Sequence, residues 1–229
     1  MEIRRMHLLK GAEEASGIAV IIDVFRAFSD EVCMFERGAE HVYCVKEVQD
    51  AFAMKERFPE ALLAGERNGI KVEGFDFGNS PAEIMKQDLT GKTVIHTTSA
   101  GVQGLMAAVH ADEIITGSLR NAKAIASYIK RKNPDVVSLC AMGWNGTKET
   151  EEDELCAEYI ESLLNDNEME NIKERALYLK EQEGKKFFDP AQKDVFPEGD
   201  FWLCIETDVS DFVLKAVKHE GCFEMIRVQ

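Results

Sequence analysis

Short apolar runs alternate along the chain with segments in which apolar residues recur at helical spacing. Six of these runs are each followed by such a segment: "IAVIID", "HVYCV", "ALLAG", "KTVIHTT", "DEIITG" and "DVVSLCAMG". Strands that alternate with helices indicate an α/β fold. The runs are apolar almost throughout, which is typical of strands covered on both faces. We therefore predict a three-layer α/β/α arrangement around a largely parallel, mixed sheet.

The pattern changes after Leu164. Residues 165–188 combine dense charge with sparse apolar positions, and we expect them to form a helical cap or a surface insertion. The segments "FWLCIETD" and "CFEMIRVQ" are interpreted as two further strands with a helix between them. The chain has no internal repeat and no low-complexity linker, so we expect residues 1–229 to form a single domain.

Composition narrows the classes of function. The net charge of −15 argues against nucleic-acid binding, which needs a basic surface. No apolar run is long enough to span a membrane and the N-terminus lacks an apolar signal region, so we expect a cytoplasmic protein. The six cysteines form no CxxC pair, which predicts reduced and mostly buried thiols. An anionic substrate stays compatible with this charge if the site is locally positive or holds a metal ion.

Polar residues collect where the predicted strands end. They are Asp23, Arg26, Glu66, Arg67, Asn68, Thr97, Thr98, Ser99, Ser118, Asn121, Glu152 and Asp153. Ligands of α/β sheets bind beyond the carboxyl ends of the strands. If the strands are parallel, these residues share one rim of the sheet, and we interpret that rim as the site.

The residue types on this rim suggest phosphate binding together with a divalent ion. Helix starts with small hydroxyl residues, such as Thr97–Gly101 and Gly117–Ser118, can bind phosphate oxygens. Arg26 and Arg67 offer planar guanidinium groups to an oxyanion. Hard oxygen ligands for Mg2+ could come from Asp23, Glu66, Asp76, Glu152 and Asp153.

Several of these residues also have a purely structural interpretation. Ser80 precedes Pro81 in a capping-box sequence and could serve only as a helix cap. Asp23 could cap the following helix, and the acids after Thr150 suit the first turn of a helix. Cys140, Cys156 and His96 are interpreted as core residues.

Five segments then occur in a familiar order: "IDVFRAFSDEV", "GERNGIKVEGFDFGNSPAEI", "HTTSAGVQGL", "GSLRNAKAIA" and "CAMGWNGTKETEEDELCAEYI". Together they resemble the 2-phosphosulfolactate phosphatase family, also called ComB, from about residue 19 to residue 164. The resemblance implies a ComB-like three-layer fold. It also implies Mg2+-dependent hydrolysis of 2-phospho-3-sulfolactate to 3-sulfolactate and phosphate, a step of coenzyme M biosynthesis.

The rim chemistry and the resemblance together assign roles to individual positions. We predict Asp23, Arg26 and Arg67 to be catalytic, with either a metal-positioned water or Asp23 as the nucleophile. The predicted substrate-binding residues are Asn79, Ser80, Thr97, Thr98, Ser99, Ser118 and Asn121. The predicted Mg2+ ligands are Asp23, Glu66, Asp76, Glu152 and Asp153.

Two departures from the family pattern bear on the substrate. Phe28 stands where many members have a hydroxyl residue, and Ser99 stands where many have an asparagine, with Ala100 following. These changes leave a non-catalytic binder of small anionic metabolites as an alternative. A haloacid-dehalogenase-type phosphatase is a further alternative, although Phe25 stands where that class has its second aspartate. We expect a homodimer, because closed symmetric oligomers are common.

Overall fold

The computed structural model describes all 229 residues, and its ten strands form one mixed sheet. The order across the sheet is β1-β8-β2-β7-β9-β10-β3-β6-β4-β5. The strands are β1 (Glu2–His7), β2 (Ile18–Ile22), β3 (His41–Cys44), β4 (Leu62–Arg67), β5 (Ile70–Lys71), β6 (Thr93–Thr97), β7 (Glu113–Gly117), β8 (Val136–Ala141), β9 (Val213–His219) and β10 (Cys222–Val228).

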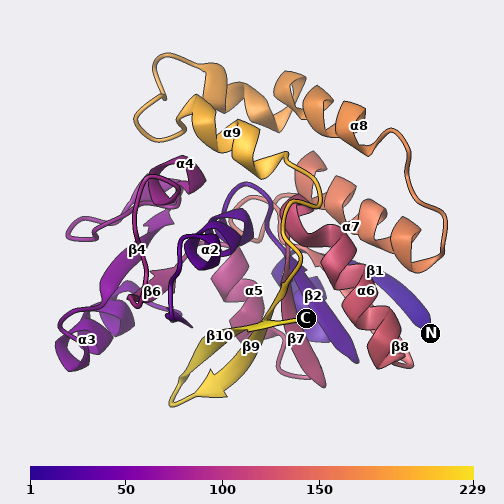
Figure 1. The fold of residues 1–229 in the computed structure, drawn as a ribbon, viewed down its shortest axis with the longest axis horizontal. Helices are drawn as coiled ribbons and strands as arrows, with labels where there is room; N and C mark the ends of the chain where they lie inside the picture. Colours follow the sequence, from indigo (N-terminus) through magenta and orange to yellow (C-terminus); the bar gives the residue numbers. More distant parts are fainter.

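Nine α-helices accompany the sheet (Figure 1). They are α1 (Leu8–Glu14), α2 (Ala27–Glu36), α3 (Val48–Arg57), α4 (Pro81–Ile84), α5 (Gly101–Ala107), α6 (Ala122–Lys132), α7 (Glu151–Leu164), α8 (Ile172–Tyr178) and α9 (Glu198–Cys204). Three short 3₁₀ segments span Leu119–Asn121, Leu179–Glu181 and Glu183–Phe188. No helix is both long and apolar enough to cross a membrane.

The sheet consists of two groups of parallel strands with an antiparallel hairpin between them. Strands β1, β8, β2 and β7 are parallel to one another, and so are β3, β6 and β4. The β9–β10 hairpin pairs antiparallel with β7 on one side and with β3 on the other. The strands of one group therefore run in the opposite direction to the strands of the other group. Yet the segments after β2 and β6 are in contact, because Gly101 N–H donates to the Asp23 carboxylate over 2.9 Å.

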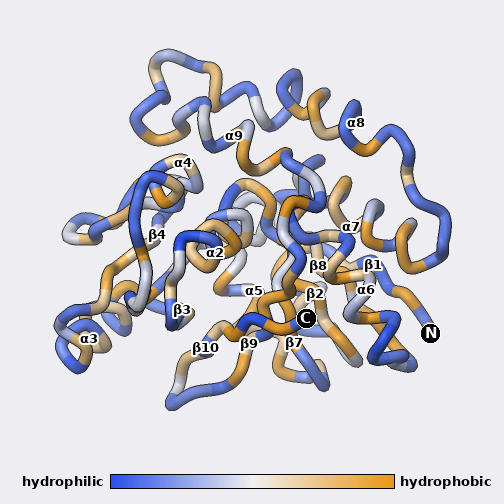
Figure 2. The backbone as a smooth tube through the Cα atoms, viewed as in Figure 1, coloured by the Kyte–Doolittle hydropathy of each residue, from blue (hydrophilic) through white to orange (hydrophobic).

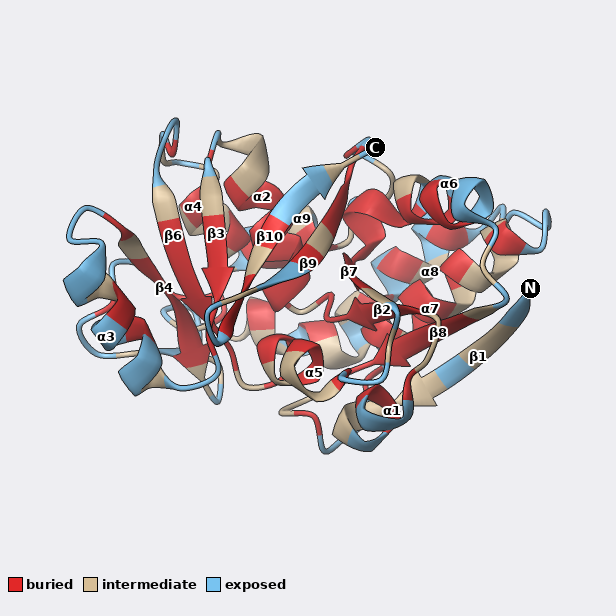
Figure 3. Cartoon of the chain, turned by 90° about the horizontal axis from the view of Figure 1, so that it is seen from below, coloured by how far each residue is buried: buried red, intermediate tan, exposed pale blue.

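Helices cover both faces of the sheet. In β2, Ala19 and Ile21 join the core formed with α1, α2 and α5, whereas Ile18, Val20 and Ile22 join the core formed with α6 and α7. Helix α3 packs over β3, β4 and β6 in a third, smaller core. Figure 2 shows apolar residues gathered in the sheet. Figure 3 shows β2, β7 and β8 almost entirely buried and β9 and β10 partly exposed. The predicted three-layer α/β/α fold with a largely parallel, mixed sheet is confirmed.

Two elements near the C-terminus contradict the sequence interpretation. The segment expected as a strand at 201–208 begins inside α9, and the segment expected as a helix contains β9. Helix α9 buries Phe201 and Cys204, which are three residues apart and lie on one helical face. A short apolar run does not distinguish a helix from a strand by periodicity. Strand β9 has helix-favouring Leu, Lys and Ala, but pairing on both edges with β7 and β10 overrides that preference.

Residues 165–205 lie across one side of the molecule, over α2, α4 and α7 (Figure 1). This segment contains α8, two of the 3₁₀ segments and α9, and we call it the cap. Phe187 and Phe201 are buried at its centre, with ring centroids 6.1 Å apart. Both rings also pack against Phe25, which joins the cap to the turn after β2.

Replacing Phe201 by alanine should lower the free energy of unfolding by about 3–5 kcal/mol, because the ring is fully buried among aromatic neighbours. The adjacent Trp202 is 41% exposed, and Trp202→Ala should cost about 1 kcal/mol or less. Urea denaturation of both variants measures the difference. Equal losses would contradict the helical register of α9.

Candidate active site

A small cavity of about 30 Å³ lies beyond the carboxyl ends of β2, β4 and β8. It is lined by Asp23, Phe25, Arg26, Glu66, Gly69, Asn79, Ser99, Ala100, Gly143, Trp144, Asn145 and Phe196. Five of these residues were predicted from the sequence: Asp23, Arg26, Glu66, Asn79 and Ser99. The structure therefore brings together the central part of the predicted rim, even though its strands belong to two oppositely directed groups.

Asp23 is held at the junction of the two strand groups. Its Oδ1 accepts from the N–H of Ala27 at 3.1 Å, and its Oδ2 accepts from the N–H of Gly101 at 2.9 Å. The side chain is buried, and this burial, reinforced by the nearby charge of Glu66, raises its pKa to about 6. Asp23 thus accepts the N–H of the first residue of α2, although the N-cap position itself is Arg26, and lines the cavity at the same time.

Glu66, near the end of β4, is fixed in the same manner. Its Oε1 accepts from the N–H of Ser99 at 2.6 Å, and its Oε2 accepts from the N–H of Gly69 at 2.6 Å and from Ser99 Oγ at 3.1 Å. The backbone N–H groups of Ser99 and Gly101, which the sequence suggested for a phosphate, therefore bind carboxylates in this structure.

Glu152 and Asp153 belong to the first turn of α7, and their charges act on the nearby Asp23 site. Asp153 accepts from the N–H groups of Val24 at 2.7 Å and Gly143 at 2.8 Å. Gly143 adopts a positive φ of 62°, and a side chain there would collide with the backbone oxygen of Lys148. Burial raises the pKa of Glu152 to about 7. Burial, and then the charges of Glu152 and Asp23, raise the pKa of Asp153 well above its usual range.

The two arginines predicted to bind an oxyanion already have partners. Arg26 donates to the carboxylate of Asp200 at 2.6 Å and to the carbonyl oxygens of Val195 and Gly69 at 2.8 and 3.1 Å. Arg67 donates to the carbonyl oxygens of Glu66 and Lys46 and to Thr97 Oγ1. Arg26 therefore joins the two walls of the cavity, and Arg67 holds the ends of β4 and β6 together outside it.

Several other predicted residues serve the surrounding architecture. Asp76 is exposed and accepts from the N–H of Leu63 on β4, so the structure places this predicted metal ligand outside the cavity. Ser80 caps α4 and donates to Asp200 at 2.7 Å, which supports its structural interpretation. Thr98 Oγ1 accepts from Val102 N–H within α5. Thr97 donates to the carbonyl oxygen of Lys46.

Ser118 and Asn121 do not line the cavity either. They bond to each other around the turn after β7, where Asn121 Oδ1 accepts from both the N–H and the Oγ of Ser118. The amide nitrogen of Asn121 donates to the carbonyl oxygen of Phe212, just before β9. The two residues therefore attach the central hairpin to the end of β7.

The prediction from sequence missed Lys186 in the cap. Its ammonium group lies 4.7 Å from the ring centroid of Trp144, 5.1 Å from Phe196, 5.5 Å from Phe187 and 5.8 Å from Phe25. It has no hydrogen-bond partner and no acidic partner within 4.0 Å, and burial lowers its pKa. The charges of Glu152, Asp23 and Asp153 act on it in the opposite direction. No motif marked this lysine, because its position depends on the packing of the cap.

Trp144, Asn145 and Phe196 cover the cavity and were not predicted either. Asn145 donates to Asn68 Oδ1 at 2.8 Å and so links two turns on opposite sides of the site. Phe196 lies under the guanidinium group of Arg26, with 4.9 Å between the ring centroid and Cζ. The sequence alone gives little reason to assign these residues to a site, because aromatic residues in loops are common in proteins without any ligand.

The donor set fits a magnesium ion in part. Mg2+ prefers carboxylate oxygens but takes only one or two of them and keeps several waters. Asp23, Glu66 and Glu152 are buried acids, and Glu152 Oε2 has no hydrogen-bond partner. No three carboxylates of this site have oxygen atoms mutually within 4.8 Å. The residues therefore suit an ion that retains water ligands and do not form a complete protein cage.

Buried acids with raised pKa values in a cavity at the carboxyl ends of parallel strands are typical of the active site of an α/β enzyme. A model of the 2-phosphosulpholactate phosphatase family matches residues 4–218. The chain belongs to this family, which places it among the hydrolases of phosphoric monoesters, and the resemblance predicted from the sequence motifs is confirmed.

Individual relatives agree over most of their length. The chain is 32% identical to a probable 2-phosphosulfolactate phosphatase of Bacillus subtilis over 89% of this chain and 88% of that protein. A protein of the same description from Carboxydothermus hydrogenoformans is 42% identical over 73% of this chain and 68% of its own. A third protein of this description, from Clostridium perfringens, is 34% identical over 86% of this chain and 85% of its own length.

The raised pKa of Glu152 predicts a pH-dependent stability. The pKa of this carboxyl is 4.5 in the unfolded chain and about 7 in the folded protein. The stability that its protonated form contributes is therefore fully present below pH 4.5 and is lost as the pH rises through about 7. In metal-free buffer, Glu152→Gln should therefore be more stable than the parent at pH 8, by on the order of 1–3 kcal/mol, and similar to it near pH 4. Glu151→Gln, at the exposed neighbouring position, should leave the pH profile unchanged. Urea titrations across this range measure both variants, and parallel profiles for all three proteins would contradict the assignment.

Proposed function

We propose that the protein hydrolyses the phosphate monoester of a small 2-hydroxy acid with the help of Mg2+, and that the substrate is 2-phospho-3-sulfolactate. The products are then 3-sulfolactate and phosphate, in coenzyme M biosynthesis. The observation that carries this proposal is a charge imbalance. The buried acids Asp23 and Glu66 line the cavity, and the buried acids Glu152 and Asp153 lie behind it, whereas Lys186 in the neighbouring groove is the nearby cation that lacks a partner.

A divalent ion would offset this excess of negative charge. Asp23 and Glu66, whose oxygens keep lone pairs beyond those used by the backbone N–H groups, would hold it, with Glu152 as the third candidate ligand. Mg2+ supplies charge stabilisation to phosphoryl oxygens and orients the attacking group in an in-line displacement. The backbone bonds to Asp23 and Glu66 keep both carboxylates in place before the substrate arrives, which reduces reorganisation during the reaction.

Lys186 would provide the direct cationic contact to the phosphate. The guanidinium groups of Arg26 and Arg67 already donate hydrogen bonds to the protein, so neither has a free pair of N–H groups for a phosphate. The ammonium group of Lys186 is unpaired and enclosed by aromatic rings, where an ionic hydrogen bond is stronger than in water. Asn79 also lines the cavity, and its side-chain amide N–H groups could donate to the same ligand.

A larger groove next to the cavity suits the acidic organic half of the substrate. The groove has a volume of about 590 Å³ and shares Arg26, Gly69 and Asn79 with the cavity. Lys71, Lys86 and Lys193 line it, together with the acids Glu83 and Asp194. The positive charge in this groove would favour a carboxylate or sulfonate group. Phe28 is fully buried in the core and lines neither space, so this departure from the family pattern does not touch the substrate directly.

Substrate binding requires the cover of the cavity to move. A volume of about 30 Å³ holds about one water molecule and is too small for a phosphate group. Trp144 and Phe196 separate the cavity from an outer groove of about 520 Å³ that also contains Lys186. Displacement of these two rings would join both spaces and bring Lys186 to the bound ester.

The alternative functions have less support from the site. Phe25, where a haloacid-dehalogenase-type enzyme needs its second aspartate, packs its ring edge-on against Phe187 at 5.1 Å and provides no acid. A non-catalytic binder would not need four buried carboxylates, because they repel the anion it has to bind. Phosphate hydrolysis assisted by a divalent cation would account for both the acids and the lysine.

The central test measures phosphate release from 2-phospho-3-sulfolactate with Mg2+ and with excess chelator. We expect release only with Mg2+. We expect Asp23→Asn to lower kcat by at least about 1,000-fold, because Asp23 acts on the metal or on phosphorus. Asp76→Asn is the matched control: this acid lies outside the cavity, an asparagine oxygen can still accept from Leu63 N–H, and activity should stay near normal. Circular dichroism and thermal denaturation verify that both variants are folded.

The outcomes separate the alternatives. Turnover that is insensitive to chelation would contradict the role of the metal. Equal activity of the Asp23→Asn variant and the parent would contradict the role of Asp23. Tight anion binding without turnover on any 2-phosphohydroxy acid would favour the non-catalytic binder.

Lys186→Met should lower kcat/KM by about 10–100-fold, the loss expected for one ionic hydrogen bond to the phosphate. The exposed neighbour Lys185 supplies the control, and Lys185→Met should change kcat/KM less than about twofold. Steady-state kinetics of the two variants at saturating Mg2+ provide the comparison. Similar effects of both substitutions would show that only the overall charge of the cap matters.

A further inference from the structure

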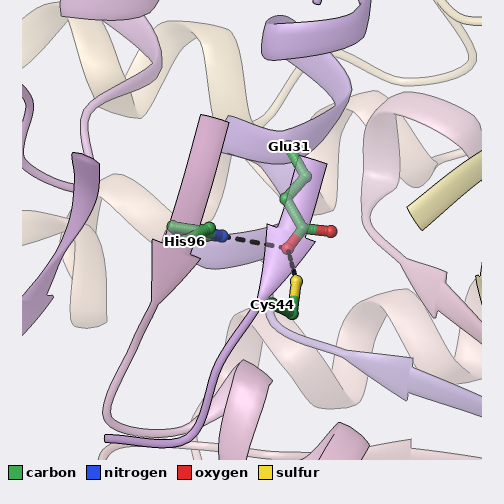
Figure 4. Close-up of side chains that lie close together, drawn as sticks. All are labelled: Glu31, Cys44 and His96. Atoms are coloured by element: carbon green, nitrogen blue, oxygen red, sulfur yellow. Dashed lines mark hydrogen bonds and ion pairs between the residues drawn. The ribbon is translucent and has the colours of Figure 1, made fainter. Parts of the chain in front are cut away.

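A second cluster of ionisable residues lies in the core, between helix α2 and strands β3 and β6. Glu31 Oε1 accepts from Cys44 Sγ at 3.0 Å and is paired with His96 Nδ1 at 2.9 Å (Figure 4). The donor atoms of these three side chains all lie within 4.8 Å of one another. The three residues are separated in sequence and come from three different elements, so only the tertiary fold brings them to one point.

The cluster is completely enclosed. Glu31, Cys44 and His96 are all 0% exposed, and none of them lines the active-site cavity. No lysine or arginine lies within 4.0 Å of Glu31, and His96 is the only basic side chain at that distance. Two buried polar atoms, Glu31 Oε2 and His96 Nε2, have no hydrogen-bond partner. Buried polar groups in native proteins are rarely left in that condition, so the cluster calls for an explanation.

A catalytic or redox role does not fit this arrangement. Glu31 lies between the thiol and the imidazole, so His96 cannot take the proton of Cys44 directly, as a cysteine nucleophile would require. Cys44 is a free thiol, as are the other five cysteines. The absence of solvent exposure also keeps oxidants and substrates away from the sulfur.

We propose that Glu31, Cys44 and His96 bind a structural divalent transition-metal ion, with Zn2+ as the best match. A carboxylate oxygen, an imidazole nitrogen and a thiolate sulfur are the three ligand types that zinc takes from proteins. Binding releases the thiol proton of Cys44 to solvent. One thiolate, one carboxylate and one Zn2+ then sum to zero charge beside a neutral imidazole, which suits a site without water. The unpartnered Glu31 Oε2 is a candidate for the fourth position.

The proposed ion would stabilise the elements that support the active site. Glu31 belongs to α2, whose first residues follow Asp23, and His96 immediately precedes Thr97 at the end of β6. A metal bound to both would join α2 to the strands of the second parallel group by coordinate bonds. The proposal does not depend on the phosphatase reaction, because none of its ligands contacts the cavity.

The full-length unmodified protein, stripped of metal, provides the first test. Titration with Co2+ should produce a thiolate-to-cobalt charge-transfer absorption in the near ultraviolet that saturates at one equivalent and disappears when Zn2+ is added. The carboxylates of the active site can also bind cobalt, but they cannot produce a sulfur band. A titration without that absorption would overturn the proposal and leave a hydrogen-bonded cluster only.

Variants provide the second test. Cys44→Ala should abolish the absorption and weaken zinc affinity by at least about 100-fold, since even loss of an outer-sphere partner costs about 10–100-fold. Cys140→Ala is the matched control: Cys140 is equally buried in β8, and the only hydrogen bond of its side chain is to the carbonyl oxygen of Ser138. Zn2+ should raise the melting temperature of the parent and of Cys140→Ala but not that of Cys44→Ala. A zinc-dependent rise of the same size in Cys44→Ala would assign the stabilisation to another site.

Discussion

The hydrogen bond from Gly101 N–H to Asp23 joins the two halves of this protein. Asp23 follows β2 in one group of parallel strands, and Gly101 begins the helix after β6 in the other. Because the hairpin β9–β10 gives the two groups opposite senses, a flat sheet would place these ends at opposite edges. The structure nevertheless brings them within hydrogen-bond distance of each other. The geometry of the cavity depends on that contact.

Acids held by backbone N–H groups explain how the site tolerates its charge. Asp23, Glu66 and Asp153 each accept at least two backbone hydrogen bonds, which favour the charged form, while burial favours the neutral form. For Asp23 burial prevails, and its pKa rises to about 6. The remaining charge is offset in part by Lys186 from the cap. The cap therefore contributes to the site both its aromatic cover and its free cation.

The sequence predicted the fold correctly where apolar runs alternate with helical segments. The six strand–helix pairs follow from alternation of apolar runs and helical segments, and each of these runs contains a strand. The sequence did not predict β1 or α1 near the N-terminus, and it assigned the wrong type of element to the segments that form α9 and β9. In "FWLCIETD" the apolar residues suit a strand, but burial of Phe201 and Cys204 selects a helix. In β9 two paired edges outweigh the helix preference of Leu214, Lys215 and Ala216.

The sequence by itself determined which acids stand at the strand ends, because an apolar run that stops on a carboxylate places it at the edge of the sheet. Asp23 and Glu66 follow from that pattern, whereas Asp153 lies in the first turn of α7, after the loop that follows β8. Only the tertiary structure decided how the other polar groups are used. Arg26 and Arg67 donate hydrogen bonds that connect neighbouring segments, and Asp76 accepts from β4 outside the cavity. Lys186 lies in the cap, where the charges of the buried acids act on it. Side-chain direction depends on long-range packing and hydrogen-bond partners, and neither is encoded in local spacing.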